Sequence, residues 1–169
     1  LVNKGLILAG HDISAGGLIT TLLEMCFANV EGGMEISLDK MKEQDIIKIL
    51  FAENPGIVIQ ISDKHKEEVK KILEDAGVGF VKLGKPAVER HILVSKGDAT
   101  YQFGVDYMRD VWYSSSYLLD RKQSMNGCAK KRFENYKMQP VEFAFMPGFK
   151  GKLSQYGITP DRRTPSGVR

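Results

Sequence analysis

The stretch "LILAGHDISAGGLITTLLEMCFANV", residues 6–30, joins three patterns that together decide the fold. It contains a short apolar run bounded by glycines, GLILAG (5–10), which is typical of a buried strand. Polar residues and a Gly-Gly pair interrupt the run, and apolar residues then recur at helical spacing from Gly17 to about Ala28. The stretch therefore predicts a strand, a short loop and a helix.

Strands and helices are expected to alternate along much of the remaining chain. Further strands are expected at 34–38, 56–62, 78–85, 90–96 and 99–104. Further helices are expected at 42–54, 62–77, 105–123 and 128–136. A turn at Gly97-Asp98 joins the last two strands in a hairpin. The pattern predicts an α/β fold in which a mixed sheet is covered by helices, partly ferredoxin-like.

The periodicity ends after Lys137, where four of the six prolines lie. We expect residues 1–123 to form an α/β domain, and 124–169 to form a short helix followed by a Pro/Gly-rich basic linker. The chain begins at Leu1 and ends where a strand-like segment starts, so we interpret it as a piece of something longer.

Composition narrows the class of protein. The 169 residues carry 24 basic and 21 acidic side chains, a net charge of +3 that is too small to predict nucleic-acid binding. No apolar run has the length of a membrane helix. Two cysteines, Cys26 and Cys128, lack metal-site spacing and favour a reduced, cytoplasmic protein.

The loop after the first strand carries the residues that could bind a ligand. Asp12 has the hard oxygen ligands that Mg²⁺ uses beside phosphates, and Ser14 can donate to a phosphate. Gly16 and Gly17 permit close backbone approach before a helix N-terminus, where anions bind. A second interpretation stays open, in which Asp12 or Ser14 simply caps the helix. His11, Asp12 and Ser14 are too close in sequence to form a nucleophile triad.

Four segments resemble one enzyme family in order and at compatible spacing. "AGHDISAGGLITTLLEMCFA" is similar to the His-Asp-x-Ser-Asp-Gly-Gly-Leu segment of phosphoribosylformylglycinamidine synthase. The likeness continues through "FAENPGIVIQIS", "LGKPAVERHILV" and "MRDVWYSSSYLLDRKQ", and covers about residues 6–136. One departure is Ala15, where the family often has Asp or Ala, and it affects only additional polar contacts at that position.

The resemblance implies a fold and a place in a larger enzyme. The fold would be that of the C-terminal domain of aminoimidazole ribonucleotide synthetase, in the second of two such repeats. The partners would be the first repeat, the N-terminal half of the second repeat, and a glutaminase domain beyond Arg169. The parent would be a ligase of purine biosynthesis that converts formylglycinamide ribonucleotide, glutamine and ATP into formylglycinamidine ribonucleotide.

The resemblance also implies roles for single residues. Asp12 matches a Mg²⁺ ligand and Ser14 a nucleotide contact in an auxiliary site that holds Mg²⁺ with ATP or ADP. Gly16 and Gly17 match the backbone that shapes the loop, and His11 is adjacent to the site without a firm role. No catalytic residue is carried over, so we expect the isolated chain to be inactive.

Two alternatives remain from the sequence. Thiamine-monophosphate kinase and selenophosphate synthetase share the superfamily, although they lack the long linker after the last helix. A ferredoxin-like regulatory or RNA-binding module would need aromatic residues on the exposed face of the sheet. The expected strands offer mainly Ile, Val and Leu.

Overall fold

A four-stranded mixed sheet forms the base of the fold in the computed structural model, which describes residues 1–136 and 148. Its strand order is β4 (Gly84–Ala87), β2 (Gly33–Ser37), β5 (His91–Lys96) and β6 (Ala99–Gly104). The β2 and β5 strands are parallel, and the other pairs are antiparallel. The predicted α/β class with a mixed sheet is confirmed, as is the hairpin of β5 and β6.

A separate two-stranded sheet carries the motif region. It pairs β1 (Ile7–Ile13) with β3 (Gly56–Ile61) in antiparallel register. The strand expected at 5–10 therefore continues through His11 and Asp12, because both residues pair across to β3. The expectation that the chain leaves the strand before these two residues is wrong.

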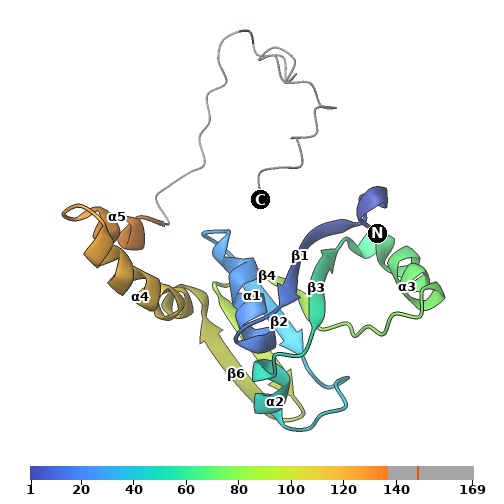
Figure 1. Cartoon of the computed structure of the whole chain (residues 1–169). Coiled ribbons are helices and arrows are strands. Elements are labelled where there is room, and N and C mark those ends of the chain that lie inside the picture. Colours follow the sequence, from blue (N-terminus) through green and yellow to red (C-terminus); the bar gives the residue numbers. More distant parts are fainter. Residues whose placement is uncertain (137–147, 149–169) are drawn as a thin grey trace, which may run out of the picture. The chain divides into compact units, whose positions relative to one another are not determined.

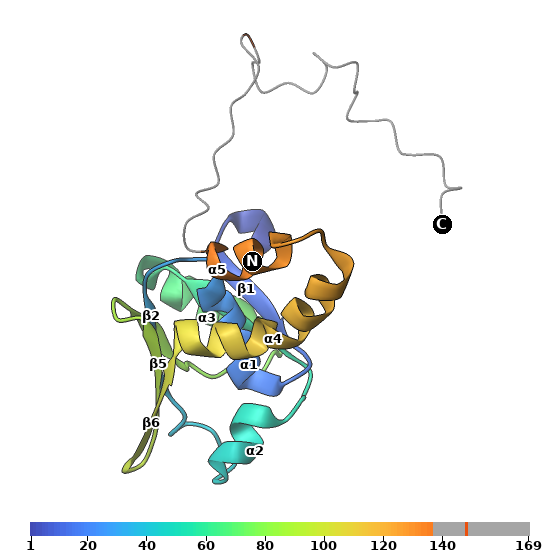
Figure 2. The same cartoon turned by 90° about the vertical axis from the view of Figure 1, so that its left-hand side faces the viewer.

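Helix α1 (Gly17–Phe27) follows β1 and supplies much of the core. Its apolar residues recur every three or four positions and pack with residues of β2, β5, α2 (Ile46–Phe51) and α4 (Val105–Gln123). The fully enclosed side chains include Leu22, Ile92, Val94 and Val105. Figure 1 shows α1 lying over the strands, and Figure 2 shows α1, α2 and α4 on one side of the four-stranded sheet.

The opposite face of the four-stranded sheet is polar. Lys85, Glu35, Leu93 and Gln102 form one row across the strands, and Lys85 pairs with Glu35 at 2.9 Å. Such a row suits a face in contact with water. This row lacks the aromatic side chains that an RNA-binding sheet uses for base stacking. The finding argues against an RNA-binding module.

Three expected elements are shorter than the sequence suggests. The helix expected at 42–54 is confined to α2, where the Asp45 carboxylate caps the amides of Ile47 and Lys48. The helix expected at 62–77 begins with a 3-10 turn, Asp63–His65, before α3 (Lys66–Asp75). Residues 78–83 of the strand expected at 78–85 are not in a strand.

Arg90 joins the end of α1 to the rest of the fold. Its guanidinium donates from Nη1 to the carbonyls of Cys26 and Gly32, each at 3.1 Å, and from Nε to the Asp106 carboxylate at 3.1 Å. Because one side chain ties α1, the following loop and α4 together, α1 has a fixed place beneath the motif strand.

The described chain closes with a helical hairpin. Helix α5 (Cys128–Glu134) packs against α4, where Arg109 donates to the Phe133 carbonyl at 2.9 Å and Arg132 pairs with Asp120. The chain divides into a unit of Leu1–Asn135 and a unit of Tyr136–Arg169. The expected linker lies outside the described residues apart from Gly148, and its assignment stays a prediction. Among the described residues, no helix is long and apolar enough to cross a membrane.

Candidate functional site

The main chain at Asp12 is held by two hydrogen bonds. Its carbonyl oxygen accepts from the Thr21 hydroxyl at 3.0 Å and lies 2.8 Å from Nδ1 of the His11 ring. Thr21 projects from α1 and is 1% exposed, so this donor is fixed in the interior. The structure thus anchors the end of β1 from the helix beneath it.

The Asp12 carboxylate is free of that anchoring. The side chain is 74% exposed, and Oδ1 lies 3.6 Å from the His11 Nδ1 atom. The ring nitrogen is closer to the carbonyl oxygen than to the carboxylate. Asp12 therefore presents a charged group to solvent from a backbone position that is fixed.

Neither Asp12 nor Ser14 caps α1. The residue at the N-cap position is Gly16, and no side-chain cap hydrogen bond is made there. Ser14 instead uses its carbonyl to accept from the Gly17 amide at 3.0 Å, which closes the turn before the helix. The capping interpretation of these two side chains is wrong, and both side chains lie at the exposed surface.

A different carboxylate meets the start of α1. The Gly16 amide donates to Oε1 of Glu53 at 2.9 Å, from a residue that follows α2. A negative charge at this end of a helix is favourable because the helix dipole is positive there. The Gly16 amide is thus already engaged within the chain.

The two glycines are needed for the turn and for packing. Both have left-handed backbones, with φ of 85° at Gly16 and 73° at Gly17. A Cβ on Gly17 would lie 2.7 Å from the Leu50 carbonyl oxygen, inside the contact distance of any real side chain. The close approach of α2 explains the second glycine without any ligand.

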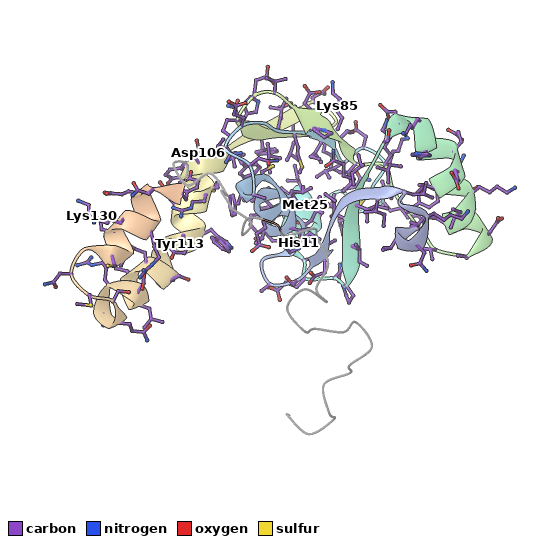
Figure 3. The ribbon with its side chains drawn as sticks, turned by 90° about the horizontal axis from the view of Figure 1, so that it is seen from above. His11, Met25, Lys85, Asp106, Tyr113 and Lys130 are labelled. Atoms are coloured by element: carbon purple, nitrogen blue, oxygen red, sulfur yellow. The ribbon has the colours of Figure 1, made fainter. Side chains whose placement is uncertain are left out.

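His11 is turned towards α1, where it meets Glu24. Its Nε2 atom lies 3.2 Å from Oε2 of Glu24, and Oε1 of Glu24 accepts from the Trp112 indole N–H at 2.9 Å. The His11 side chain is 32% exposed, and Figure 3 shows it on the side of β1 beside α1. Trp112 also packs on Phe27, with ring centroids 5.3 Å apart.

Three residues next to the motif escaped the sequence analysis: Thr21, Glu24 and Glu53. Glu24 had a local signal, because it is the only charged residue of α1. A lone carboxylate on an otherwise apolar helix predicts a specific partner. Glu53 had no such signal, since it lies 37 positions from the amide that it accepts from.

The described residues supply one ligand of a metal site rather than a complete site. No group of three or more His, Cys, Asp or Glu residues among them can hold a metal ion. The exposed Asp12 carboxylate fits Mg²⁺, which takes one or two protein carboxylates together with phosphate oxygens and water. Other ligands would have to come from outside these residues.

A protein-family model described as "AIR synthase related protein, C-terminal domain" matches residues 1–94, more than half of the chain. The chain belongs to this family. The match spans β1, α1, the loop between them and Glu53, so the whole candidate site lies within the family domain.

Named relatives point to one larger protein. Human "Phosphoribosylformylglycinamidine synthase" is 33% identical over 132 residues, which are 76% of this chain and 10% of the relative. The Saccharomyces cerevisiae protein of the same name is 31% identical over 92% of this chain and 11% of its own length. The chain thus spans about a tenth of the relatives it matches.

A solved structure supports the fold. The protein titled "T. maritima PurL complexed with ATP" superposes with a TM-score of 0.55 at 17% identity, covering 62% of this chain and 19% of its own. At this identity the likeness concerns the fold, which agrees with the domain family.

Proposed function

We propose that this chain is part of a phosphoribosylformylglycinamidine synthase, where it helps to form an auxiliary Mg²⁺-nucleotide site. The observation that carries the proposal is the state of Asp12, whose carbonyl is fixed by Thr21 and His11 while its carboxylate is 74% exposed. A side chain that neither caps a helix nor enters the core is available for a ligand.

The proposed roles follow the geometry. Asp12 would bind Mg²⁺, which neutralises phosphate charge when it is bound. Ser14, at the surface two residues further on, would donate its hydroxyl to the nucleotide. Gly16 and Gly17 would hold the turn that places these two residues, and His11 would support Asp12 from within.

The remainder of the site would come from other domains of the parent. Among the described residues, no group of three or more His, Cys, Asp or Glu residues could hold a metal ion, and we infer that the first repeat or the N-terminal half of the second repeat would add further ligands. The parent would convert formylglycinamide ribonucleotide, glutamine and ATP in the cytoplasm, with ammonia supplied by a glutaminase domain. The names of the human and yeast relatives favour this reading over a thiamine-monophosphate kinase or a selenophosphate synthetase.

The substitution Asp12→Asn in the full-length parent tests the proposal. It removes the charge that binds Mg²⁺ and keeps nearly the same shape, so we expect less nucleotide after purification and a lower melting temperature. A ligand present at a hundredfold excess over its Kd stabilises by about 2.7 kcal/mol, and the variant should lose much of that. Nucleotide content by chromatography and melting with and without Mg-ADP provide the measurements.

Asp45→Asn is the matched control, because Asp45 is a true helix cap that accepts from the Ile47 and Lys48 amides. Asn caps nearly as well as Asp, so this variant should keep its nucleotide. If Asp12→Asn retained as much nucleotide as Asp45→Asn and melted at the same temperature, Asp12 would not be a metal ligand.

A further inference from the structure

Glu24 contacts the candidate site but has no role in the proposed function. It lies on α1, its side chain is 23% exposed, and its two oxygens contact groups on different elements. Oε2 lies 3.2 Å from the His11 ring on β1, and Oε1 accepts from the Trp112 indole on α4 at 2.9 Å. One carboxylate therefore connects three elements of the fold.

The His11 ring continues this connection to the candidate site. Both of its nitrogens face oxygen atoms, the Glu24 carboxylate at Nε2 and the Asp12 carbonyl at Nδ1. The ring is therefore in contact at both ends, with a side chain of α1 at one nitrogen and the main chain of β1 at the other. Held in this way, the ring has one orientation, in which Nδ1 points at the Asp12 main chain.

We propose that Glu24 is a positioning residue for Asp12, acting through His11 with its own orientation set by Trp112. The inference rests on the proposed function, because it assigns Glu24 a role in the Mg²⁺ affinity of that site. Removal of a residue that orients a metal ligand commonly lowers the metal affinity by about 10–100-fold. The Trp112 ring also contacts Phe27 and Tyr113, which favours the orientation in which its indole N–H meets Glu24.

A purely structural ion pair makes a different prediction. Loss of such a pair would weaken folding and would lower every ligand affinity by a similar factor. A positioning residue acts on the metal ligand, so its loss should lower only the part of the ADP affinity that Mg²⁺ adds. The ratio of ADP affinities with and without Mg²⁺ separates these two roles.

The experiment uses the full-length parent, stripped of nucleotide and titrated calorimetrically with ADP in the presence and absence of Mg²⁺. Glu24→Ala should lower the Mg²⁺-dependent gain in affinity by about tenfold and leave the Mg²⁺-free affinity within about twofold. Glu24→Gln should keep most of the gain. Its amide oxygen can accept from Trp112, and its amide N–H can donate to a His11 ring protonated at Nδ1.

Val69→Ala is the control for lost stability, because Val69 is 3% exposed on α3, outside the site. It should destabilise the protein without changing the Mg²⁺-dependent gain. Hydrogen exchange followed by mass spectrometry gives a readout without nucleotide. Peptides that contain residues 11–14 should exchange faster in Glu24→Ala than in Glu24→Gln or Val69→Ala.

Asp12→Asn, measured alongside, separates this inference from the proposed function. If Asp12→Asn loses the Mg²⁺-dependent gain while Glu24→Ala keeps it, Glu24 is not a positioning residue and the proposed function stands. If both variants keep the gain, both proposals fail. If Glu24→Ala and Val69→Ala lost the Mg²⁺-dependent gain in ADP affinity equally, Glu24 would be a structural contact and not a positioning residue.

Discussion

Replacement of Gly17 by alanine tests why the loop needs its second glycine. The residue has a φ of 73°, and an added Cβ would lie 2.7 Å from the Leu50 carbonyl oxygen and 2.9 Å from the Phe51 Cα. The left-handed backbone costs an alanine about 1–2 kcal/mol. Contact with main-chain atoms, which cannot rotate away, adds about 1–3 kcal/mol. We expect a total destabilisation of roughly 2–5 kcal/mol.

Gly77→Ala is a matched control. Gly77 has a similar φ of 66°, and nothing lies within 4 Å of the Cβ that alanine would add. Both variants share the left-handed strain and the reduced entropy of the unfolded chain, so the difference between them isolates the close approach of α2. That difference should be about 1–3 kcal/mol, which is roughly 4–12 °C in melting temperature for a domain of this size.

Thermal and urea unfolding of the two variants, followed by circular dichroism, measures this difference directly. Equal melting temperatures for Gly17→Ala and Gly77→Ala would refute the reasoning, because α2 would then not press on the start of α1. The expected difference would show that the packing of α2, in addition to the left-handed backbone, requires this glycine, whatever ligand the loop receives.

Three further outcomes follow from burial and charge. Burial raises the pKa of the Cys26 thiol, so a thiol reagent should label exposed Cys128 in the folded chain and reach Cys26 only after unfolding, as counted by mass spectrometry. Arg132 lowers the pKa of the Asp120 carboxyl, so this ion pair stabilises the fold above about pH 5. Its contribution to the free energy of unfolding is lost as the pH falls through the lowered pKa. Asp120→Asn should therefore reduce the pH dependence of stability on the acid side. Thr21→Val removes a buried donor to the end of β1 and should cost about 1–3 kcal/mol in urea unfolding.

Local sequence patterns predicted an element correctly where the surrounding structure favoured the same conformation. Helix α4 has the predicted bounds, 105–123, because its start after a strand and its apolar spacing are both local signals. Residues 78–83 show the limit of such signals. Val78, Phe80 and Val81 have strand-forming side chains, yet each is at least 43% exposed and none lies in a strand. Strand propensity takes effect only where a neighbouring strand is in place.

The sequence groups the candidate residues but does not give their arrangement. The motif suggests one loop for Asp12, Ser14 and the two glycines, whereas Asp12 lies within β1 and Gly17 begins α1. Its local pattern suited a helix cap equally well, and only the structure shows Glu53 meeting the Gly16 amide instead. Contacts between residues so distant in sequence depend on the packing of α2 against α1, which no local pattern records.

The polar groups around Asp12 differ in exposure: two of them are enclosed in the fold, and the Asp12 carboxylate is not. The Thr21 hydroxyl is 1% exposed and Glu24 is largely enclosed, so both give up water for their contacts. The Asp12 carboxylate, in contrast, stays 74% exposed, and an exposed charge adds little to folding. Glu53 already meets the Gly16 amide, and the Asp12 carboxylate is the exposed charge next to it that a metal ion could meet. The buried hydrogen bonds thus fix the main chain at Asp12, and the proposed metal-binding role would use the solvent-facing carboxylate of the same residue.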